Sequence, residues 1–426
     1  MTNEFGITLL DMLLLYTQLA GELDNNLKLH HQRTAYVAYR IARRRGLPEQ
    51  ELERVLHTAL IHDIGIITAH NEKIEWLSFD LNDYGYHGKV GGFLTAQSEV
   101  LRPFSRIISH HHVKWIERAQ MSHLPEIEQE IQQILHIADR MTTLIADNRA
   151  IAFQREDILN KMAAASGTMF KPELVDILME VESKEAFWLE LEQGDLFDYL
   201  KYHDLHFLHP LTNDEIMDVA RTIVYAVDYR QTYTAAHSIA TAELAGILAE
   251  KMDVSPHDLL ITRFGMLLHD IGKIKIDSHI FNNPKELTRE EFELVQSHPF
   301  IGRKLINDAL HLPEVAKLIA HHHERLDGSG YPFNLQGHQL KLLDRIGAIA
   351  DMTCAMMEDR PYRQGCDQEC VLAEIRSQAY SRKLDMAVYK VLEDNIDEIF
   401  PKIKDTIGGT FGTYRKLLEI MMTGDM

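Results

Sequence analysis

Histidine and aspartate recur in a fixed order in the second half of this sequence. The order is a lone histidine, a His-Asp pair, another lone histidine, two members of a triple histidine and a final aspartate: His237, His269, Asp270, His298, His322, His323 and Asp351. Seven such side chains are too many for one tetrahedral zinc ion, but they suit two metal ions that share a carboxylate. The pattern therefore predicts a two-metal centre.

Asp270 directly follows His269, and we expect its carboxylate to bridge the two ions. The other six residues then divide into two ligand groups: His237, His269 and Asp351 in one, and His298, His322 and His323 in the other. Mixed imidazole and carboxylate ligands favour iron or manganese, with nickel or zinc as alternatives. Two neighbouring ions can activate water for in-line attack on phosphorus, so the predicted chemistry is hydrolysis of a phosphate ester.

The first half of the chain repeats this order. LIHDIG at 60–65 matches LLHDIG at 267–272, and IISHHHVKW at 107–115 matches LIAHHHERL at 318–326. The corresponding residues of the first copy, which form a candidate second metal site, are His30, His62, Asp63, His87, His111, His112 and Asp139. Matching motifs that recur in the same order indicate a duplicated domain. We place the two domains at residues 1–205 and 206–426, with the connector at 194–210 followed by a capping box of Thr212 and Glu215.

Helical periodicity dominates the elements that must position these residues. One apolar stripe contains Leu52, Val55, Leu56, Ala59 and Leu60, and a second contains Ala240, Leu244, Ile247 and Leu248. The twelve prolines mostly punctuate short gaps between such stripes. The predicted fold class is all-α, with two tandem helical domains of the same type.

The composition is that of a globular protein, with 45% apolar and 25% charged residues among 426. The net charge of −20 excludes a general role on polymeric nucleic acid, which needs clustered lysine and arginine. Three cysteines, Cys354, Cys366 and Cys370, form no disulfide framework and fit a reducing cytoplasm. The apolar segment at 7–23 contains Asp11 and predicts a packed or interface helix, suggestive of a homodimer, and not a membrane span.

Three motifs stand out in the second copy: HDIGK at 269–273, HHERLDGSGYP at 322–332 and RPYR at 360–363. They resemble the motifs of the bacterial HD-GYP cyclic dinucleotide phosphodiesterases, a branch of the HD phosphohydrolase superfamily. The resemblance covers residues 208–400, and the first half resembles the broader HD fold. It implies a metal-dependent enzyme that opens cyclic di-GMP or 3'3'-cyclic GMP-AMP to a linear dinucleotide with a 5' phosphate.

The resemblance also implies roles for single residues. The seven residues of the second copy become metal ligands, and Asp270 and Lys273 become catalytic, the lysine acting on the phosphoryl charge or the leaving 3' oxygen. Arg360 and Arg363 would hold phosphate. The turn with Gly330 and Tyr331 would let backbone approach the substrate. The structural alternatives are a helix-terminal charge for the lysine, surface charges for the arginines and a packing role for the tyrosine.

The chain departs from the family pattern at several positions. Tyr233 stands where some members have a glutamate for a third metal, so we expect two ions and cleavage that stops at the linear dinucleotide. Cys354 replaces an acid near the lysine. In the first copy, Ile66 replaces the lysine, and VKWIERAQMSHLPE at 113–126 replaces the GYP turn. We therefore interpret the first copy as a degenerate regulatory or docking domain.

Two other functions remain as alternatives. The chain could be an HD phosphohydrolase that acts on nucleoside triphosphates or an alarmone, although the turn sequence argues against it. It could instead be a catalytically weak cyclic dinucleotide receptor or a redox-responsive metal protein, which the positions of Cys354 and Tyr233 leave open. Turnover of a cyclic dinucleotide separates the leading function from both.

Overall fold

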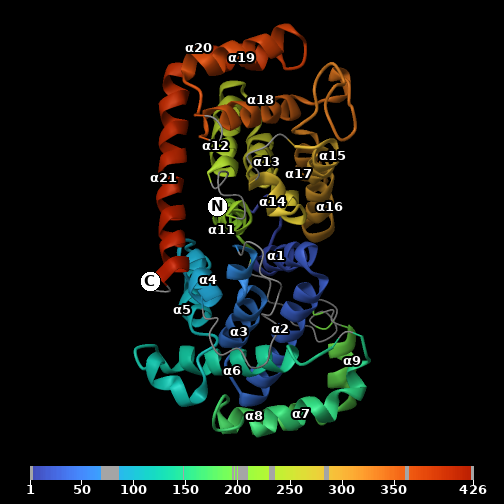
Figure 1. Cartoon of the computed structure of the whole chain (residues 1–426), viewed down its shortest axis with the longest axis vertical. Helices are drawn as coiled ribbons and strands as arrows, with labels where there is room; N and C mark the ends of the chain where they lie inside the picture. Colours follow the sequence, from blue (N-terminus) through green and yellow to red (C-terminus); the bar gives the residue numbers. More distant parts are fainter. Residues whose placement is uncertain are drawn as a thin grey trace. The chain divides into compact units, whose positions relative to one another are not determined.

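The computed structural model describes residues 3–68, 86–146, 148–193, 196, 199, 210–229, 236–282, 287–359 and 364–423. These residues form helices, with only isolated β-bridges between extended segments (Figure 1). The all-α prediction is confirmed. The chain divides into an N-terminal unit, residues 8–210 with 419–426, and a C-terminal unit, residues 1–7 with 211–418. The domain bounds predicted from the sequence stay a prediction, because most of the connector lies outside the described residues.

The N-terminal unit is built around α2, which packs against α1, α3 and α6. Its helices are α1 (Leu9–Leu23), α2 (Asn25–Arg45), α3 (Glu49–Ile61), η1 (Ile64–Thr68), α4 (Tyr86–Ala96), α5 (Arg102–Ser109), η3 (Trp115–Met121), α6 (Glu126–Thr142), η4 (Ile151–Phe153), α7 (Arg155–Ala164), α8 (Pro172–Val181) and α9 (Glu185–Gln193). The stripe of α3 predicted from periodicity is buried from Val55 onward.

The C-terminal unit is built around α12, which packs against α13 and α18. Its helices are α11 (Asn213–Asp228), α12 (His237–Lys251), α13 (Pro256–Leu267), η5 (Ile271–Lys275), α14 (Ser278–Asn282), α15 (Arg289–Val295), α16 (His298–Leu310), α17 (Pro313–His321), η6 (Gly337–Gln339), α18 (Leu342–Met357), α19 (Gln368–Tyr380), α20 (Met386–Asp394) and α21 (Ile396–Thr423). The predicted capping box at the start of α11 is confirmed, with the Glu215 carboxylate accepting from the Thr212 amide at 2.7 Å.

The first residues of the chain belong to the C-terminal unit, which the sequence pattern does not indicate. The Leu211 amide donates to the Ile7 carbonyl at 3.0 Å, and the Phe5 ring lies 5.6 Å from the Phe264 ring. The apolar helix α1 follows and buries Leu10, Leu13 and most of its other apolar side chains inside the N-terminal unit. Its composition therefore no longer supports a homodimer. Among the described residues, no helix is long and apolar enough to cross a membrane.

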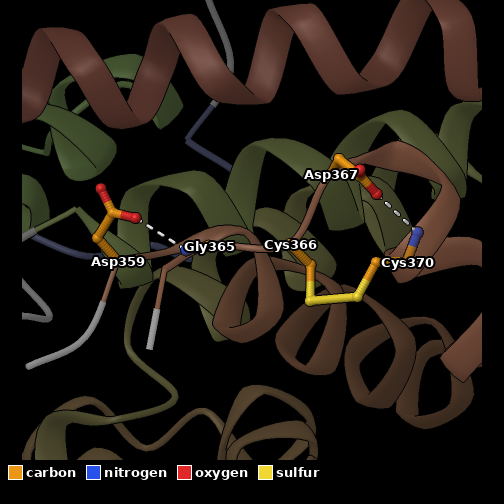
Figure 2. Close-up of a disulfide and its surroundings, with 5 residues drawn as sticks. All are labelled: Asp359, Gly365, Cys366, Asp367 and Cys370. Carbon is orange, nitrogen blue, oxygen red and sulfur yellow. Dashed lines mark hydrogen bonds between the residues drawn. A yellow bond between two sulfur atoms is a disulfide. The ribbon is translucent and has the colours of Figure 1, made fainter. Parts of the chain in front are cut away.

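Two of the three cysteines are joined, contrary to the sequence interpretation. Cys366 and Cys370 form a disulfide at the start of α19, with Cα atoms 5.5 Å apart (Figure 2). The helix cap brings them together, because Asp367 accepts a hydrogen bond from the Cys370 amide at 2.9 Å. The bridge closes a single turn and is a local link within one element. Cys354 is free and buried.

Candidate metal centres

The seven histidines and aspartates of the C-terminal unit converge from five separate elements. His237 and His298 begin α12 and α16, and Asp351 lies within α18. His269 and Asp270 follow α13, and His322 and His323 follow α17. Helices α12, α13, α17 and α18 pack on one another, so the ends of these helices bring the side chains to one place. All but His323 are almost fully buried.

The Asp270 carboxylate lies between two groups of imidazoles. Its Oδ2 atom is 3.4 Å from His269 Nε2 and 3.8 Å from His237 Nε2. Its Oδ1 atom is 3.3 Å from His298 Nε2 and 4.0 Å from His322 Nε2. Each oxygen therefore faces a different group, as a bridging carboxylate requires.

Asp351 completes the first group and touches the second. Its Oδ1 atom is 3.1 Å from His237 Nε2 and 3.7 Å from His269 Nε2, and its Oδ2 atom is 3.4 Å from His323 Nδ1. Two sets of donor atoms lie close enough to hold a metal ion each: His237, His269 and Asp351, and His298, His322 and His323. These are the two groups into which the sequence pattern divides the ligands.

Backbone carbonyls orient three of the imidazoles. The Nδ1 atoms of His269, His298 and His322 lie 2.7, 2.6 and 2.6 Å from carbonyl oxygens three residues earlier. Carbonyls at the ends of helices lack an intrahelical partner and are free to accept. An Nδ1–H that donates to a carbonyl leaves the Nε2 lone pair pointing at the cluster, which is the arrangement of metal-ligating histidine.

Asp270, His322 and His323 have the charge states that a metal ion binds. Burial opposes ionisation of Asp270, yet the charges of His269 and Lys273 hold its pKa well below the usual range. Burial lowers the pKa of His323 to about 3 and that of His322 well below its usual value, so both rings are neutral. The buried atoms His269 Nε2 and Asp270 Oδ1 have no hydrogen-bond partner. Neutral imidazoles, carboxylates and unpaired donor atoms fit divalent metal ions.

The N-terminal unit assembles its seven residues in the same way. Asp63 Oδ2 lies 3.2 Å from His62 Nε2, and Asp63 Oδ1 lies 3.3 Å from His87 Nε2 and 3.5 Å from His111 Nε2. His30 Nε2 is 3.2 Å from Asp139 Oδ1, and His112 Nε2 is 2.8 Å from His87 Nε2. Groups of these residues could also hold metal ions.

The glycine-rich turn that follows the triple histidine is held by a buried acid. Glu324 is 1% exposed, and its carboxylate accepts from the amides of Phe333 at 2.7 Å and Leu335 at 2.9 Å. The Tyr331 amide donates to the His323 carbonyl at 3.3 Å, and the two rings lie 4.7 Å apart. The turn is thus tied directly to a residue of the second ligand group.

Comparisons with known proteins agree with this geometry. Two family models, both described as HD domain, match residues 29–144 and 219–388. The 3'3'-cGAMP-specific phosphodiesterase 1 of Vibrio cholerae is 28% identical over 381 residues, 87% of this chain and 88% of that protein. The cyclic di-GMP phosphodiesterase response regulator RpfG of Xanthomonas campestris is 36% identical over 155 residues, 36% of this chain and 41% of that protein.

The chain belongs to the HD-GYP family. A crystal structure of a cyclic GMP-AMP-specific phosphodiesterase of Vibrio cholerae matches 92% of this chain and 98% of that chain, with a TM-score of 0.59 and 20% identity. This likeness shows a shared fold. The HD-GYP motif lies in the C-terminal unit, and the N-terminal unit is an HD domain without it.

Sequence reasoning missed one residue of the HD-GYP site, Glu358. Its carboxylate is 1% exposed, and its Oε2 atom lies 3.5 Å from His237 Nδ1. Burial favours a neutral His237 ring, but Glu358 and Asp351 raise its pKa to about 10. A carboxylate behind an imidazole orients the ring and strengthens it as a ligand. The only sequence signal is an acid just before the RPYR segment, which does not reveal burial.

We expect Glu358→Gln to lower the metal affinity of the C-terminal unit by about 10- to 100-fold, because the amide removes the charge behind His237 and keeps the volume. Equilibrium dialysis of the metal-free protein against Mn²⁺ measures the effect. Glu398→Gln, an exposed acid on α21, is the control. Unchanged Mn²⁺ affinity in Glu358→Gln would contradict the role.

The HD-GYP lysine pairs with the carboxylate between the two ligand groups. Lys273 Nζ lies 2.5 Å from Asp270 Oδ2 and 5.6 Å from the centre of the Phe281 ring. Its side chain is 15% exposed, so it stands at the edge of the buried cluster. Cys354 replaces one acid near this lysine, and Asp270 is its acidic partner in this structure.

Gly330 is required by the backbone of the GYP turn itself. A side chain there would overlap the backbone of Glu324 and Arg325, so the turn closes on itself only with glycine. The residue therefore shapes the turn, and a role in substrate approach stays a prediction. Gly328 has a φ of 79°, in the left-handed region.

Gly330→Ala is expected to destabilise the C-terminal unit by about 1–3 kcal/mol, because the added methyl group forces the turn backbone apart. Gly408→Ala, on α21 where an added Cβ would meet no other atom, is the matched control and should stabilise the helix by about 0.5–1 kcal/mol. Chemical denaturation measures both free energies of unfolding. Equal effects of the same sign would contradict the assignment.

The structure leaves some predicted site residues untested. Arg360, Arg363 and Tyr233 lie outside the described residues. His321, the surplus member of the triple histidine, points away from the cluster, with Nδ1 3.2 Å from Asp344 Oδ1. This contact gives His321 a structural role.

The HD domain of the N-terminal unit differs from the HD-GYP site in three respects. Ile66 is buried where the C-terminal unit has Lys273. The guanidinium of Arg140 donates from Nη2 and Nε to Asp139 Oδ2, at 2.8 and 3.0 Å. In place of the GYP turn, the chain forms the 3₁₀ helix η3. The N-terminal unit therefore lacks a counterpart of Lys273 and of the GYP turn.

Proposed function

We propose that the C-terminal unit hydrolyses a cyclic dinucleotide, cyclic di-GMP or 3'3'-cyclic GMP-AMP, to a linear dinucleotide with a 5' phosphate. The observation that carries the proposal is the Asp270 carboxylate, whose two oxygens face two separate groups of ligand atoms with Lys273 beside it. The relatives named for cleavage of these two substrates support the choice of substrate class.

Two divalent ions would be held by the groups on either side of Asp270, with iron or manganese favoured and nickel or zinc as alternatives. When bound, such ions activate water and neutralise charge on the phosphate ester. His237, His269 and Asp351 would hold one ion, and His298, His322 and His323 the other. Asp270 would keep the two at a fixed separation.

Lys273 would act on the substrate from the edge of the cluster. Its ammonium group can stabilise charge on the phosphoryl oxygens or deliver a proton to the leaving 3' oxygen. Tyr331 packs on His323 and would line the substrate side of the second ligand group. Arg360 directly follows Asp359, and Arg363 lies three residues further along the chain. We propose that both arginines bind phosphate.

The number of metal ions determines whether cleavage stops at the linear dinucleotide. Tyr233 takes the position of the third-metal glutamate of some family members, so we propose a single cleavage. A cytoplasmic location and the preference between the two substrates belong to the same proposal, and a homodimer stays a prediction.

Chromatography of the products tests the proposal. Reduced protein loaded with Fe²⁺ or Mn²⁺ is incubated with cyclic di-GMP and with 3'3'-cyclic GMP-AMP, and we expect a linear dinucleotide from at least one. If the protein bound a cyclic dinucleotide tightly but did not cleave it with Fe²⁺, Mn²⁺, Ni²⁺ or Zn²⁺, it would be a receptor and not an enzyme. If it cleaved only nucleoside triphosphates, the proposed substrate class would be wrong.

A further inference from the structure

The N-terminal unit contains an extra imidazole beside its His-Asp cluster. His31 follows the cluster residue His30 on α2 and is 1% exposed. Neither of its ring nitrogens has a hydrogen-bond partner. Leaving a buried polar group unpaired costs about 1–3 kcal/mol, so such a ring needs an explanation.

The free nitrogen of His31 points at the cluster. Its Nε2 atom lies 3.9 Å from Asp63 Oδ2, the same oxygen that lies 3.6 Å from His30 Nε2 and 3.2 Å from His62 Nε2. The His31 and His62 rings meet edge to face at 5.5 Å. Three imidazoles therefore surround one carboxylate oxygen.

We call the group formed by His30, His31, His62, Asp63 and Asp139 a half-site of the N-terminal cluster. Its other residues supply further unpaired donors. Asp139 Oδ1 and His62 Nε2 are buried without a hydrogen-bond partner, and they lie 3.7 Å from each other. The Tyr16 ring of α1 packs on His31, with centroids 5.3 Å apart, and holds the imidazole in place. The half-site thus presents three imidazoles and two carboxylates.

The C-terminal unit has no imidazole at the position that corresponds to His31. Ser238 takes the position of His31 next to the first histidine, and its short side chain is buried. The corresponding half-site there has four donors, His237, His269, Asp270 and Asp351. Catalytic metal sites keep positions open for water and substrate, whereas structural sites fill them with protein ligands.

We propose that His31 is a fifth protein ligand of a metal ion held by His30, His62, Asp63 and Asp139, and that this ion is closed to phosphate substrates. Three imidazoles with two carboxylates suit iron, manganese or zinc. At most one coordination position remains in an octahedral site. The ion stabilises the N-terminal unit and takes no part in hydrolysis.

Arg140 and Ile66 fit the same assignment. The buried guanidinium holds Asp139 Oδ2 at 2.8 Å, which fixes the carboxylate with Oδ1 toward His30 and His62. Ile66 offers no charge to a leaving group, and it is 6% exposed. The contacts favour binding of an ion over turnover of a substrate.

The test uses full-length protein in which His269→Ala and Asp270→Ala have removed the C-terminal site. Co²⁺ is titrated into this protein and into the same protein carrying His31→Ser, which recreates the residue of the C-terminal unit. We expect His31→Ser to weaken Co²⁺ binding by about 10- to 100-fold and to change the visible ligand-field absorption. Asp63→Ala, in the same background, should remove the signal.

Thermal unfolding separates ligation from a packing role. With chelator, a lower Tm of His31→Ser than of its parent reports only the packing lost when the imidazole that contacts Tyr16 is removed. With Co²⁺, the parent should gain more in Tm than His31→Ser. Equal loss of Tm in both conditions, with unchanged Co²⁺ affinity, would overturn the proposal.

Hydrolysis provides the last check on the closed site. The protein lacking the C-terminal ligands should retain its N-terminal ion and cleave neither cyclic dinucleotide. Residual cleavage that disappears on Asp63→Ala would show an open, hydrolytic N-terminal site and overturn the assignment. This outcome is independent of which substrate the C-terminal unit prefers.

Discussion

Asp270→Ala is expected to reduce hydrolysis of the cyclic dinucleotide by at least about 10³-fold, because the two proposed ions would share this one carboxylate. Its oxygens lie 3.3 Å from His298 Nε2 and 3.4 Å from His269 Nε2, so its removal leaves both ligand groups incomplete. The substitution also removes the acidic partner of the Lys273 ammonium group. Turnover measured by chromatography, together with elemental analysis of bound metal, gives the result.

Asp308→Ala is the control for this prediction. Asp308 is an exposed acid of α16, the helix that begins at His298, so its loss changes the local charge without touching the cluster. We expect normal metal content and turnover. Full activity and full metal content in Asp270→Ala would show that the two ligand groups work without a shared carboxylate.

The second large effect is expected for Lys273→Met. It should lower kcat by about 10²- to 10³-fold, since the ammonium group is the one cation of the described site aimed at the cluster edge. The two C-terminal ligand groups do not include Lys273, so the metal content should stay at the level of the unmodified protein. A large loss of kcat with intact metal distinguishes a catalytic lysine from a structural one.

Lys275→Met provides the comparison, because it removes a lysine of the same 3₁₀ helix that is exposed to solvent. Little change in kcat is expected there. If both substitutions had equal effects, the general charge near η5 would account for the rate and not the contact with Asp270. If Lys273→Met lost its metal, the lysine would be needed for the charge balance of the site.

The order of seven histidines and aspartates was sufficient to predict much of the site. The HD pair, the triple histidine and the final aspartate each lie at the end of a helix or on one face of it, so helical periodicity and spacing carry the information. The division of ligands around Asp270 was predicted because an aspartate adjacent to a ligand can reach two neighbours. The duplicated motifs likewise indicated two helical domains of one type.

Other features depend on packing between distant helices. Glu358, Glu324 and Arg140 are charged residues in sequence contexts where charges are usually solvated, and only burial shows that they hold a ligand ring, a turn and a carboxylate. The pairing of Cys366 with Cys370 depends on how the chain enters α19. Gly330 is needed by the backbone of its own turn, which spacing cannot show.

His31 shows the difference most clearly. The sequence contains a second histidine beside His30, but two adjacent helix positions usually point in different directions. Only the folded N-terminal unit shows that both rings face Asp63 and that the second has no partner. By itself the sequence determined the residue types, the helical class and the shared order of the two copies, because these follow from local chemistry and periodicity. The tertiary structure decided which polar groups are buried together, because burial depends on contacts between segments far apart in the chain.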